Sequence, residues 1–292
     1  MLKERLKEYS ELVNKEFDRI FDLADCPEKE LRESMKYSLT AGGKRLRPAL
    51  ILEGYRLFKP DYEKALPFAC AMEMIHTFSL IHDDLPAIDN DDLRRGKPTN
   101  HKVYGESTAI LAGDALLNKA YEILAIDLAN GENVDNKIKA FNIFAKAVDN
   151  MIKGEFVDID LEGKKITEEQ LMYMHNNKTG ALIKGSLLLG AVLSGADNNA
   201  LNILEEYAEI IGVNFQIKDD ILSETGDEKI LGKPIGNDKE RGKCTFVTLF
   251  GLEDAKEKLE NYTQKAVEKI KELNVDTEFF VELAIFIKER EN

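Results

Sequence analysis

The amino-acid sequence predicts an all-α protein, and three observations lead to this class. Apolar residues recur at helical spacing through almost the whole chain. No run of residues shows the period-two alternation between hairpin dipeptides that indicates β-strands. Two segments, 68–85 and 182–193, are apolar around much of the helices they would form, as is typical of helices buried among others. We therefore expect a helical bundle with these two helices at its centre.

The elements of this bundle can be justified in order along the chain. The first helix is amphipathic, because apolar residues between Leu2 and Phe21 trace one face. Asp25, Pro27 and Glu28 predict the N-cap and first turn of a second helix, since proline and acidic groups suit a helix start. Further helices are expected over 47–58, 64–84, 107–130, 136–160, 167–193, 200–222, 253–273 and 276–290. Gly and Asn gather in two expected loops, over 195–199 and 226–242.

Composition disfavours several classes of function. The 292 residues include 40 Lys and Arg against 54 Asp and Glu, and the formal charge of −14 disfavours a nucleic-acid partner. The N-terminus lacks the apolar stretch of a signal peptide, and the longest apolar segment, 185–196, is too short to span a bilayer. Cys26, Cys70 and Cys244 lack CxxC spacing, which favours reduced thiols. Without a recognisable linker, the sequence predicts one cytoplasmic domain over 1–292, with no stable membrane insertion.

An acidic cluster follows the first of the two apolar helices. The segment 83–92 holds five Asp residues and no Lys or Arg. Close carboxylates repel unless a cation relieves them, and oxygen ligands point to Mg²⁺, Ca²⁺ or Mn²⁺ rather than zinc. A solvated acidic loop is the alternative. Asp83 and Asp89 would point apart on an unbroken helix, so a shared metal requires the chain to leave helical geometry, which Pro86 permits.

A second Asp pair and several basic residues extend this pattern. Asp219 and Asp220 also end an apolar helix, and the segment 42–48 places three cations before a helix, where backbone N–H groups favour anions. Each feature alone is more often a solvated surface charge. Together they describe a polyphosphate site in which Mg²⁺ bridges carboxylates to phosphate oxygens. Because no nucleotide-binding motif is present, a diphosphate on a hydrocarbon tail fits the apolar helices better.

The motifs resemble those of the trans-isoprenyl diphosphate synthases, in the same order and over nearly the whole chain. The segment 75–99 (IHTFSLIHDDLPAIDNDDLRRGKPT) resembles the first aspartate-rich motif of this family in its bacterial form, and 215–222 (FQIKDDIL) resembles the second. Further similar motifs lie at 42–48, 111–116, 178–180, 232–238 and 243–245. Within the family, the sequence is most similar to the bacterial farnesyl diphosphate synthases, or geranyltranstransferases.

The resemblance implies an isoprenoid-synthase helical bundle with a central cavity, usually a homodimer, and assigns roles residue by residue. Three Mg²⁺ ions are expected with bound diphosphate, held by Asp83, Asp84, Asp89, Asp219 and Asp220. The allylic diphosphate is expected to bind Arg94, Lys178 and Lys233, with Lys243 as a further substrate-binding cation. Isopentenyl diphosphate is expected to bind Lys44, Arg47, His76 and Arg95.

The implied reaction is ionisation, condensation and elimination. The metal ions and cationic side chains would stabilise the leaving diphosphate as the allylic C–O bond breaks. Oxygen atoms of Thr179, Gln216 and the Lys178 carbonyl would face the resulting carbocation, and the apolar cavity would exclude water. Isopentenyl diphosphate would then attack, and the released diphosphate would take the final proton. Condensation with dimethylallyl or geranyl diphosphate would give farnesyl diphosphate.

Two residues bear on how this chain could differ from its relatives. Ser223 stands where the second motif usually has a third carboxylate, so we expect weaker metal affinity rather than inactivity. Phe78 precedes Asp83 by five positions, where the resemblance implies an aromatic floor that stops chain growth. Ideal helical angles place Ser79, not Phe78, on the face of Asp83. A geranylgeranyl diphosphate synthase and a non-catalytic synthase subunit remain alternatives, whereas a terpene cyclase would leave Lys44, Arg47 and Arg95 without a purpose.

Overall fold

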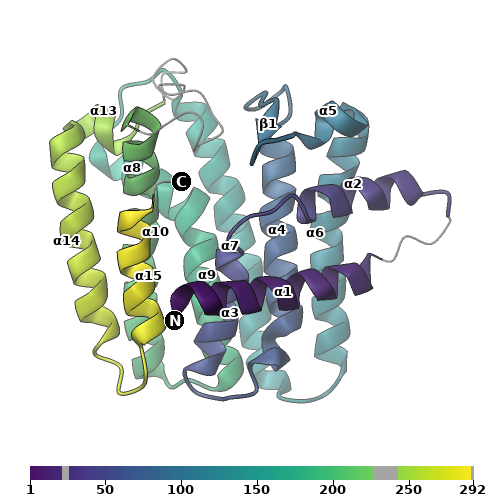
Figure 1. The fold of residues 1–292 in the computed structure, drawn as a ribbon, viewed down its shortest axis with the longest axis horizontal. Coiled ribbons are helices and arrows are strands. Elements are labelled where there is room, and N and C mark those ends of the chain that lie inside the picture. Colours follow the sequence, from purple (N-terminus) through teal and green to yellow (C-terminus); the bar gives the residue numbers. More distant parts are fainter. Residues whose placement is uncertain (22–25, 226–242, 291–292) are drawn as a thin grey trace.

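The computed structural model describes residues 1–21, 26–225 and 243–290, which form helices with one very short pair of strands (Figure 1). The first half contains α1 (Leu2–Ile20), α2 (Lys29–Leu39), α3 (Leu46–Arg56), the 3₁₀ turn η1 (Tyr62–Ala65), α4 (Leu66–Asp83), β1 (Leu93–Arg94), β2 (Lys97–Pro98), α5 (Asn100–Tyr104) and α6 (Glu106–Ala129). The second half contains α7 (Val134–Leu161), α8 (Glu168–His175), the π-helical turn η2 (Asn176–Gly180), α9 (Ala181–Ser194), α10 (Asn198–Thr225), α13 (Phe246–Phe250), α14 (Leu252–Ile270) and α15 (Glu278–Glu289).

The two apolar helices lie at the centre, as predicted. Helix α4 packs against α1, α2, α3, α6 and α9, whereas α9 packs against α3, α4, α7 and α10. Figure 1 shows the long helices standing roughly side by side, with α1 and α2 lying across them. The all-α class is therefore confirmed. None of the helices in the described ranges combines the length and the apolar character that a membrane span requires.

Close backbone contact between α3 and α9 depends on glycine. A Cβ atom at Gly190 would lie only 2.1 Å from the carbonyl oxygen of Ile51 and 2.6 Å from the backbone nitrogen of Tyr55. Such distances are far inside van der Waals contact, so only glycine allows this approach. The contact brings α3, whose first turn includes the end of the basic segment 42–48, against the central helix α9.

Several expected elements differ in detail from the structure. The second helix begins at Lys29 with Glu28 at its N-cap, so the predicted start at Pro27 is wrong, and Asp25 lies outside the described residues. The expected helix over 167–193 is divided into α8, η2 and α9, because the π-helical turn widens the backbone around Lys178. The short β1–β2 hairpin was not expected; its register pairs Leu93 with Pro98. The remaining helix boundaries differ by a few residues from those predicted.

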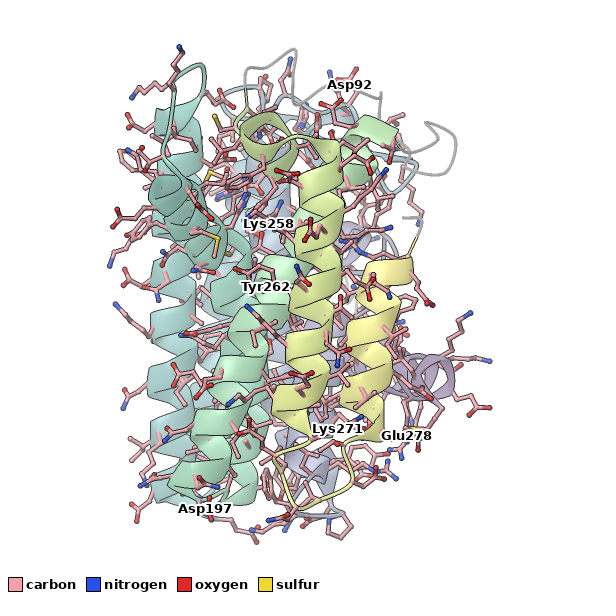
Figure 2. The ribbon with its side chains drawn as sticks, turned by 90° about the vertical axis from the view of Figure 1, so that its left-hand side faces the viewer. Asp92, Asp197, Lys258, Tyr262, Lys271 and Glu278 are labelled. Atoms are coloured by element: carbon pink, nitrogen blue, oxygen red, sulfur yellow. The ribbon has the colours of Figure 1, made fainter. Side chains whose placement is uncertain are left out.

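Both Asp pairs lie towards the same end of the bundle. Helix α4 ends at Asp83, below the β1 hairpin at the top of Figure 1. Helix α10 starts after Asp197 at the opposite end, and its 28 residues return it to the first end. Figure 2 shows these ends by the labels Asp197 and Asp92. The fold therefore brings the carboxyl ends of α4 and α10 to one face of the molecule.

Candidate active site

The first acidic segment leaves helical geometry directly after Asp83. Helix α4 ends there, and the backbone N–H of Asp89 donates to the carbonyl oxygen of Asp83 at 2.8 Å. The chain between them, which contains Pro86, therefore turns back on itself, as the sequence required for a shared ion. The turn brings Asp89 back beside the helix end that carries Asp83.

The Asp83 carboxyl lies in an environment that disfavours its negative charge. Burial raises its pKa to about 7, and the negative charges of Glu155 and Asp89 add to this shift against the opposing charges of Lys178 and Arg94. A cation at this position would relieve the repulsion. Glu155 comes from α7 and was not anticipated from the sequence.

Asp84 forms an ion pair with Arg94 in which the carboxylate is buried. The guanidinium of Arg94 donates to both of its carboxylate oxygens, from Nε at 2.7 and 2.9 Å and from Nη2 at 2.5 Å to Oδ1. The Asp84 side chain is only 4% exposed. In this structure Arg94 therefore orders the loop that follows α4, whereas the sequence predicted it as a diphosphate ligand and Asp84 as a metal ligand.

Lys178 lies in the π-helical turn η2, which packs closely on α7. A Cβ atom at Gly154 would lie 2.1 Å from the backbone nitrogen of Lys178, so glycine is required for this approach. The Lys178 ammonium contacts Glu155 at 2.8 Å and Asp158 at 2.6 Å. Burial acts to lower its pKa, but these carboxylates outweigh it and hold the pKa above the ordinary value.

Glu155 and Asp158 form a third acidic group that sequence reasoning missed. They lie three positions apart on α7, so both can face one neighbour, and this spacing was the available signal. Asp158 is 3.5 Å from the ammonium of Lys243, which also contacts Asp89 at 3.2 Å. Lys243 therefore connects the first acidic segment to α7.

The second Asp pair, like the first, has one accessible carboxylate and one buried carboxylate. Asp219 contacts Arg290 at 2.6 Å and its side chain is 41% exposed. Asp220 is buried, and its Oδ2 accepts a hydrogen bond of 2.7 Å from the backbone N–H of Phe246. Asp220 thus fixes the start of α13, whereas the sequence predicted it among the metal ligands.

Thr179 and Gln216 lie together beside this pair. The hydroxyl of Thr179 donates to the side-chain oxygen of Gln216 at 2.9 Å, and the amide nitrogen of Gln216 reaches Asp220 at 3.4 Å. Thr179 also lines an apolar pocket together with Asp83 and Lys178. Lys233, the remaining predicted diphosphate ligand, lies outside the described residues.

A basic pocket of about 650 Å³ gathers all four residues predicted for isopentenyl diphosphate. Arg95 covers Gly43, where a Cβ atom would lie 2.6 Å from its guanidinium carbon, and it donates to the carbonyl oxygen of Gly42. Arg45 instead points into the core, where it pairs with buried Glu73 at 2.8 Å. The pocket is lined by charged and polar residues that include Lys44, Arg47, His76, Arg95 and Arg290.

Arg47 and His76 have perturbed protonation equilibria in this pocket. Burial lowers the pKa of Arg47 to about 10, so the guanidinium remains charged at neutral pH. Burial, and then the positive charges of Arg47 and Arg95, hold the pKa of His76 well below its usual range. His76 is therefore neutral and can donate one hydrogen bond to an anion while remaining uncharged.

An apolar pocket of about 350 Å³ adjoins the basic one. Its lining combines the site residues Asp83, Lys178 and Thr179 with apolar side chains of α4 and α7. Both Phe78 and Ser79 line it, although helical angles favoured Ser79 alone. Phe78 is 7% exposed and its ring meets that of His82 edge to face at 5.3 Å between centroids. The pocket therefore has room for a hydrocarbon tail beside an acidic mouth.

The carboxylates suit Mg²⁺ in kind but are held by internal cations. Within the described residues, no three carboxylate, His or Cys side chains converge as a metal site. Instead Asp84, Asp89 and Asp219 each contact an Arg or Lys side chain. The oxygen-only donors and the raised pKa of Asp83 fit a hard divalent cation. Asp83 and Asp89 of the first acidic segment, and Asp219 of the second Asp pair, are the residues that would hold such ions.

Comparisons with known proteins identify the family of this chain. The polyprenyl synthetase family model matches residues 28–278. The chain is 44% identical over 275 residues to a farnesyl diphosphate synthase from Geobacillus stearothermophilus, covering 93% of this chain and 92% of the relative. It is also 44% identical over 263 residues to a geranylgeranyl diphosphate synthase from Cyanophora paradoxa, covering 89% and 87%.

Solved structures give the same result. The crystal structure of a geranylgeranyl pyrophosphate synthetase from Pyrococcus horikoshii Ot3 superposes with a TM-score of 0.87 at 32% identity, covering 99% of this chain and 98% of that chain. The resemblance carried by the sequence motifs is confirmed: the chain is a short-chain prenyltransferase that belongs to the polyprenyl synthetase family.

Proposed function

We propose that the chain condenses isopentenyl diphosphate with dimethylallyl or geranyl diphosphate, in a Mg²⁺-dependent reaction, to give farnesyl diphosphate. One observation carries this proposal. An apolar pocket and a basic pocket lie next to each other and share Arg47 and His76 in their walls. Two substrates that each combine a diphosphate with a hydrocarbon chain can therefore meet at this boundary.

The allylic substrate is proposed to bind with its tail in the apolar pocket. Its diphosphate would then lie at the mouth, near Asp83 and Lys178. Bound Mg²⁺ would supply positive charge to the leaving diphosphate. Lys178 would exchange part of its contact with Glu155 and Asp158 for phosphate oxygens.

Thr179 is proposed to stabilise the allylic cation. Its hydroxyl proton is directed to Gln216, so the oxygen lone pairs remain available to the pocket that Thr179 lines. The apolar side chains of α4 and α7 would keep water away from the cation. Gln216 would orient Thr179 through the same hydrogen bond.

Isopentenyl diphosphate is proposed to bind in the basic pocket. Lys44, Arg47 and Arg95 line it and would take the charge of its diphosphate, and neutral His76 would donate a hydrogen bond. Its double bond would then face the boundary shared with the apolar pocket. The released diphosphate would be the base for the final proton.

A product assay of the purified chain tests this proposal. The chain is incubated with Mg²⁺, dimethylallyl diphosphate and isopentenyl diphosphate, and the dephosphorylated products are separated by chromatography. We expect a fifteen-carbon product and none with EDTA. A twenty-carbon product would identify a geranylgeranyl diphosphate synthase, and no product would favour the non-catalytic subunit.

Phe78 is proposed to limit the product to fifteen carbons. Its buried ring lines the apolar pocket, so Phe78→Ala should enlarge this pocket and let further five-carbon units add. Phe68→Ala is the matched control, because Phe68 is fully buried on the same helix. It should lower stability by about 3–5 kcal/mol without lengthening the product. An unchanged product from Phe78→Ala would contradict the floor assignment.

We also propose that the chain works as a cytoplasmic homodimer. Large apolar side chains are exposed on α6 and α7, among them Leu111 at 56% and Phe156 at 70%. Phe156 also lines the apolar pocket, so a second copy on this face would help to enclose the tail. Light scattering should give twice the chain mass for the wild type and the chain mass for Leu111→Glu.

A further inference from the structure

Arg290, directly after α15, forms an ion pair with the predicted metal ligand of the second Asp pair. Its Nη2 lies 2.6 Å from Oδ1 of Asp219 and donates to the carbonyl oxygen of Phe215 at 2.9 Å. The guanidinium carbon also lies 3.9 Å from the ring centroid of Phe215. Charge, hydrogen bonding and cation–π contact therefore all position this one side chain on α10.

The guanidinium is desolvated without using all of its donors. The Arg290 side chain is 7% exposed. Its Nε is buried and has no hydrogen-bond partner in the part of the chain that the structure describes. A buried donor without a partner costs free energy, so the burial of Nε reduces the net stabilisation that the ion pair with Asp219 provides. The arrangement is therefore open to competition from another cation.

Arg290 also belongs to the basic pocket. It lines this pocket together with Lys44, Arg47 and Arg95. Desolvation, and then the positive charge of Arg290, hold the pKa of Lys44 below its ordinary value, whereas Asp219 acts in the opposite direction. In the absence of an anion, Asp219 thus compensates the cations that surround it. The Asp219 side chain, at 41% exposed, is the accessible partner of the pair.

From these contacts we propose that Arg290 is the internal counter-cation of Asp219, which a divalent metal must displace before it can bind there. The inference rests on the proposed function, because it assumes that Asp219 holds metal. Displacement transfers Asp219 from the guanidinium to the ion. It leaves Arg290 facing the basic pocket, where an anion replaces its lost partner. The ion pair therefore couples metal binding at α10 to the charge state of the basic pocket.

Metal binding without substrate tests the proposal. Mn²⁺ alone is titrated into the wild type and into Arg290→Gln, and free Mn²⁺ is followed by electron paramagnetic resonance, with heats from calorimetry. We expect Arg290→Gln to bind Mn²⁺ roughly fivefold more tightly, the ratio that corresponds to about 1 kcal/mol for a partly exposed ion pair. Arg19→Gln is the matched control, because Arg19 pairs with Glu16 on the exposed face of α1.

Asp219→Asn distinguishes this inference from the proposed function. If Asp219 binds metal, Asp219→Asn weakens Mn²⁺ binding and removes the gain from Arg290→Gln in the double variant. Equal Mn²⁺ binding by Asp219→Asn and the wild type would overturn the metal assignment and the inference together. A loss in Asp219→Asn without a gain in Arg290→Gln would overturn the inference alone.

A second variant covers the case in which Arg290→Gln does not fold. Arg290→Lys keeps the charge, but its ammonium is not planar and cannot stack on the Phe215 ring as the guanidinium does. The metal ion should therefore displace this lysine from Asp219 more easily than it displaces Arg290, and Mn²⁺ should bind more tightly than to the wild type. Binding no tighter than that of the wild type, in a folded Arg290→Lys, would also overturn the proposal.

Discussion

The two Asp pairs lie at or near the carboxyl ends of different helices, α4 and α10, yet each directs one carboxylate to the site and buries the other. Asp83 lines the apolar pocket and Asp219 pairs with a cation of the basic pocket. Asp84 and Asp220 are buried, at 3% and 4% exposed. In each pair, the trailing residue therefore fixes the surrounding chain while the leading residue is available for chemistry.

The buried partners differ between the pairs. Asp84 is neutralised by the guanidinium of Arg94, whereas Asp220 accepts from the backbone N–H of Phe246 and lies 3.9 Å from the ring nitrogen of His175. The first pair thus uses a charged donor, the Arg94 guanidinium, whereas the second uses a backbone donor, the N–H of Phe246. Substitutions of the two buried residues should therefore lower the free energy of unfolding by different amounts.

The largest expected effect concerns the leading residue of the first pair. Asp83→Ala should lower turnover about a thousandfold or more, because it removes a carboxylate on which the leaving-group metal assembles. Stability without metal should hardly fall, since the change relieves repulsion with Glu155. Steady-state kinetics at saturating Mg²⁺ and thermal unfolding measure the two effects. Asp92→Ala, which removes an exposed Asp paired with Lys102, is the control. Near-normal turnover of Asp83→Ala would contradict the metal assignment.

The next effect compares the trailing residues directly. Asp84→Asn should lower the free energy of unfolding by about 3 kcal/mol, because it removes the carboxylate that accepts the hydrogen bonds of the partly buried Arg94 and leaves only Asp91, 3.8 Å away, as its carboxylate partner. Asp220→Asn should cost only about 1 kcal/mol, since the amide oxygen can still accept from Phe246. Urea unfolding at neutral pH measures both. The double variant Asp84→Asn with Arg94→Gln should recover part of the loss. Equal costs at the two positions would remove the distinction between the pairs.

The buried ring of His175, which lies beside Asp220, makes the free energy of unfolding depend on pH. Burial lowers its pKa to about 3, whereas an unfolded histidine titrates near 6.5. The neutral ring therefore contributes stability that is fully present above pH 6.5 and is lost as the pH falls towards 3. At pH 5 this loss is about 2 kcal/mol. In urea unfolding, the free energy of unfolding of His175→Gln should fall less than that of the wild type between pH 7 and 5. Between pH 7 and 9, the two free energies should change with pH in the same way. Parallel curves across both ranges would contradict the buried neutral state.

The smallest effect concerns metal affinity at the second pair. Ser223 lies one helical turn beyond Asp219 on α10, so Ser223→Asp places a further carboxylate on the same face. We expect the Mg²⁺ concentration for half-maximal rate to fall several-fold. Ser223→Asn, which adds similar volume without charge, should leave the requirement unchanged. An equal Mg²⁺ requirement for all three chains would show that this position does not contribute to the second metal site.

The sequence by itself determined the helical class, the two central helices and the segments that form the site. Helical periodicity and apolar content are local properties, so the sequence alone indicates that 68–85 and 182–193 are buried. The turn after Asp83 was also expected, because Asp83 and Asp89 could share a metal only if the chain left helical geometry, which Pro86 permits. The motifs identified the cationic residues of the site, but they could not predict which carboxylate each cation would contact.

Only the tertiary structure decided how these charges pair. Arg94 joins Asp84, Lys243 joins Asp89, and Arg290 reaches Asp219 from 71 positions away. Glu155 and Asp158 join the site because Gly154 lets α7 approach the π-helical turn, a contact that depends on the packing of two helices. Charge pairing depends on distance in space and on desolvation, neither of which sequence spacing fixes once residues lie on different helices.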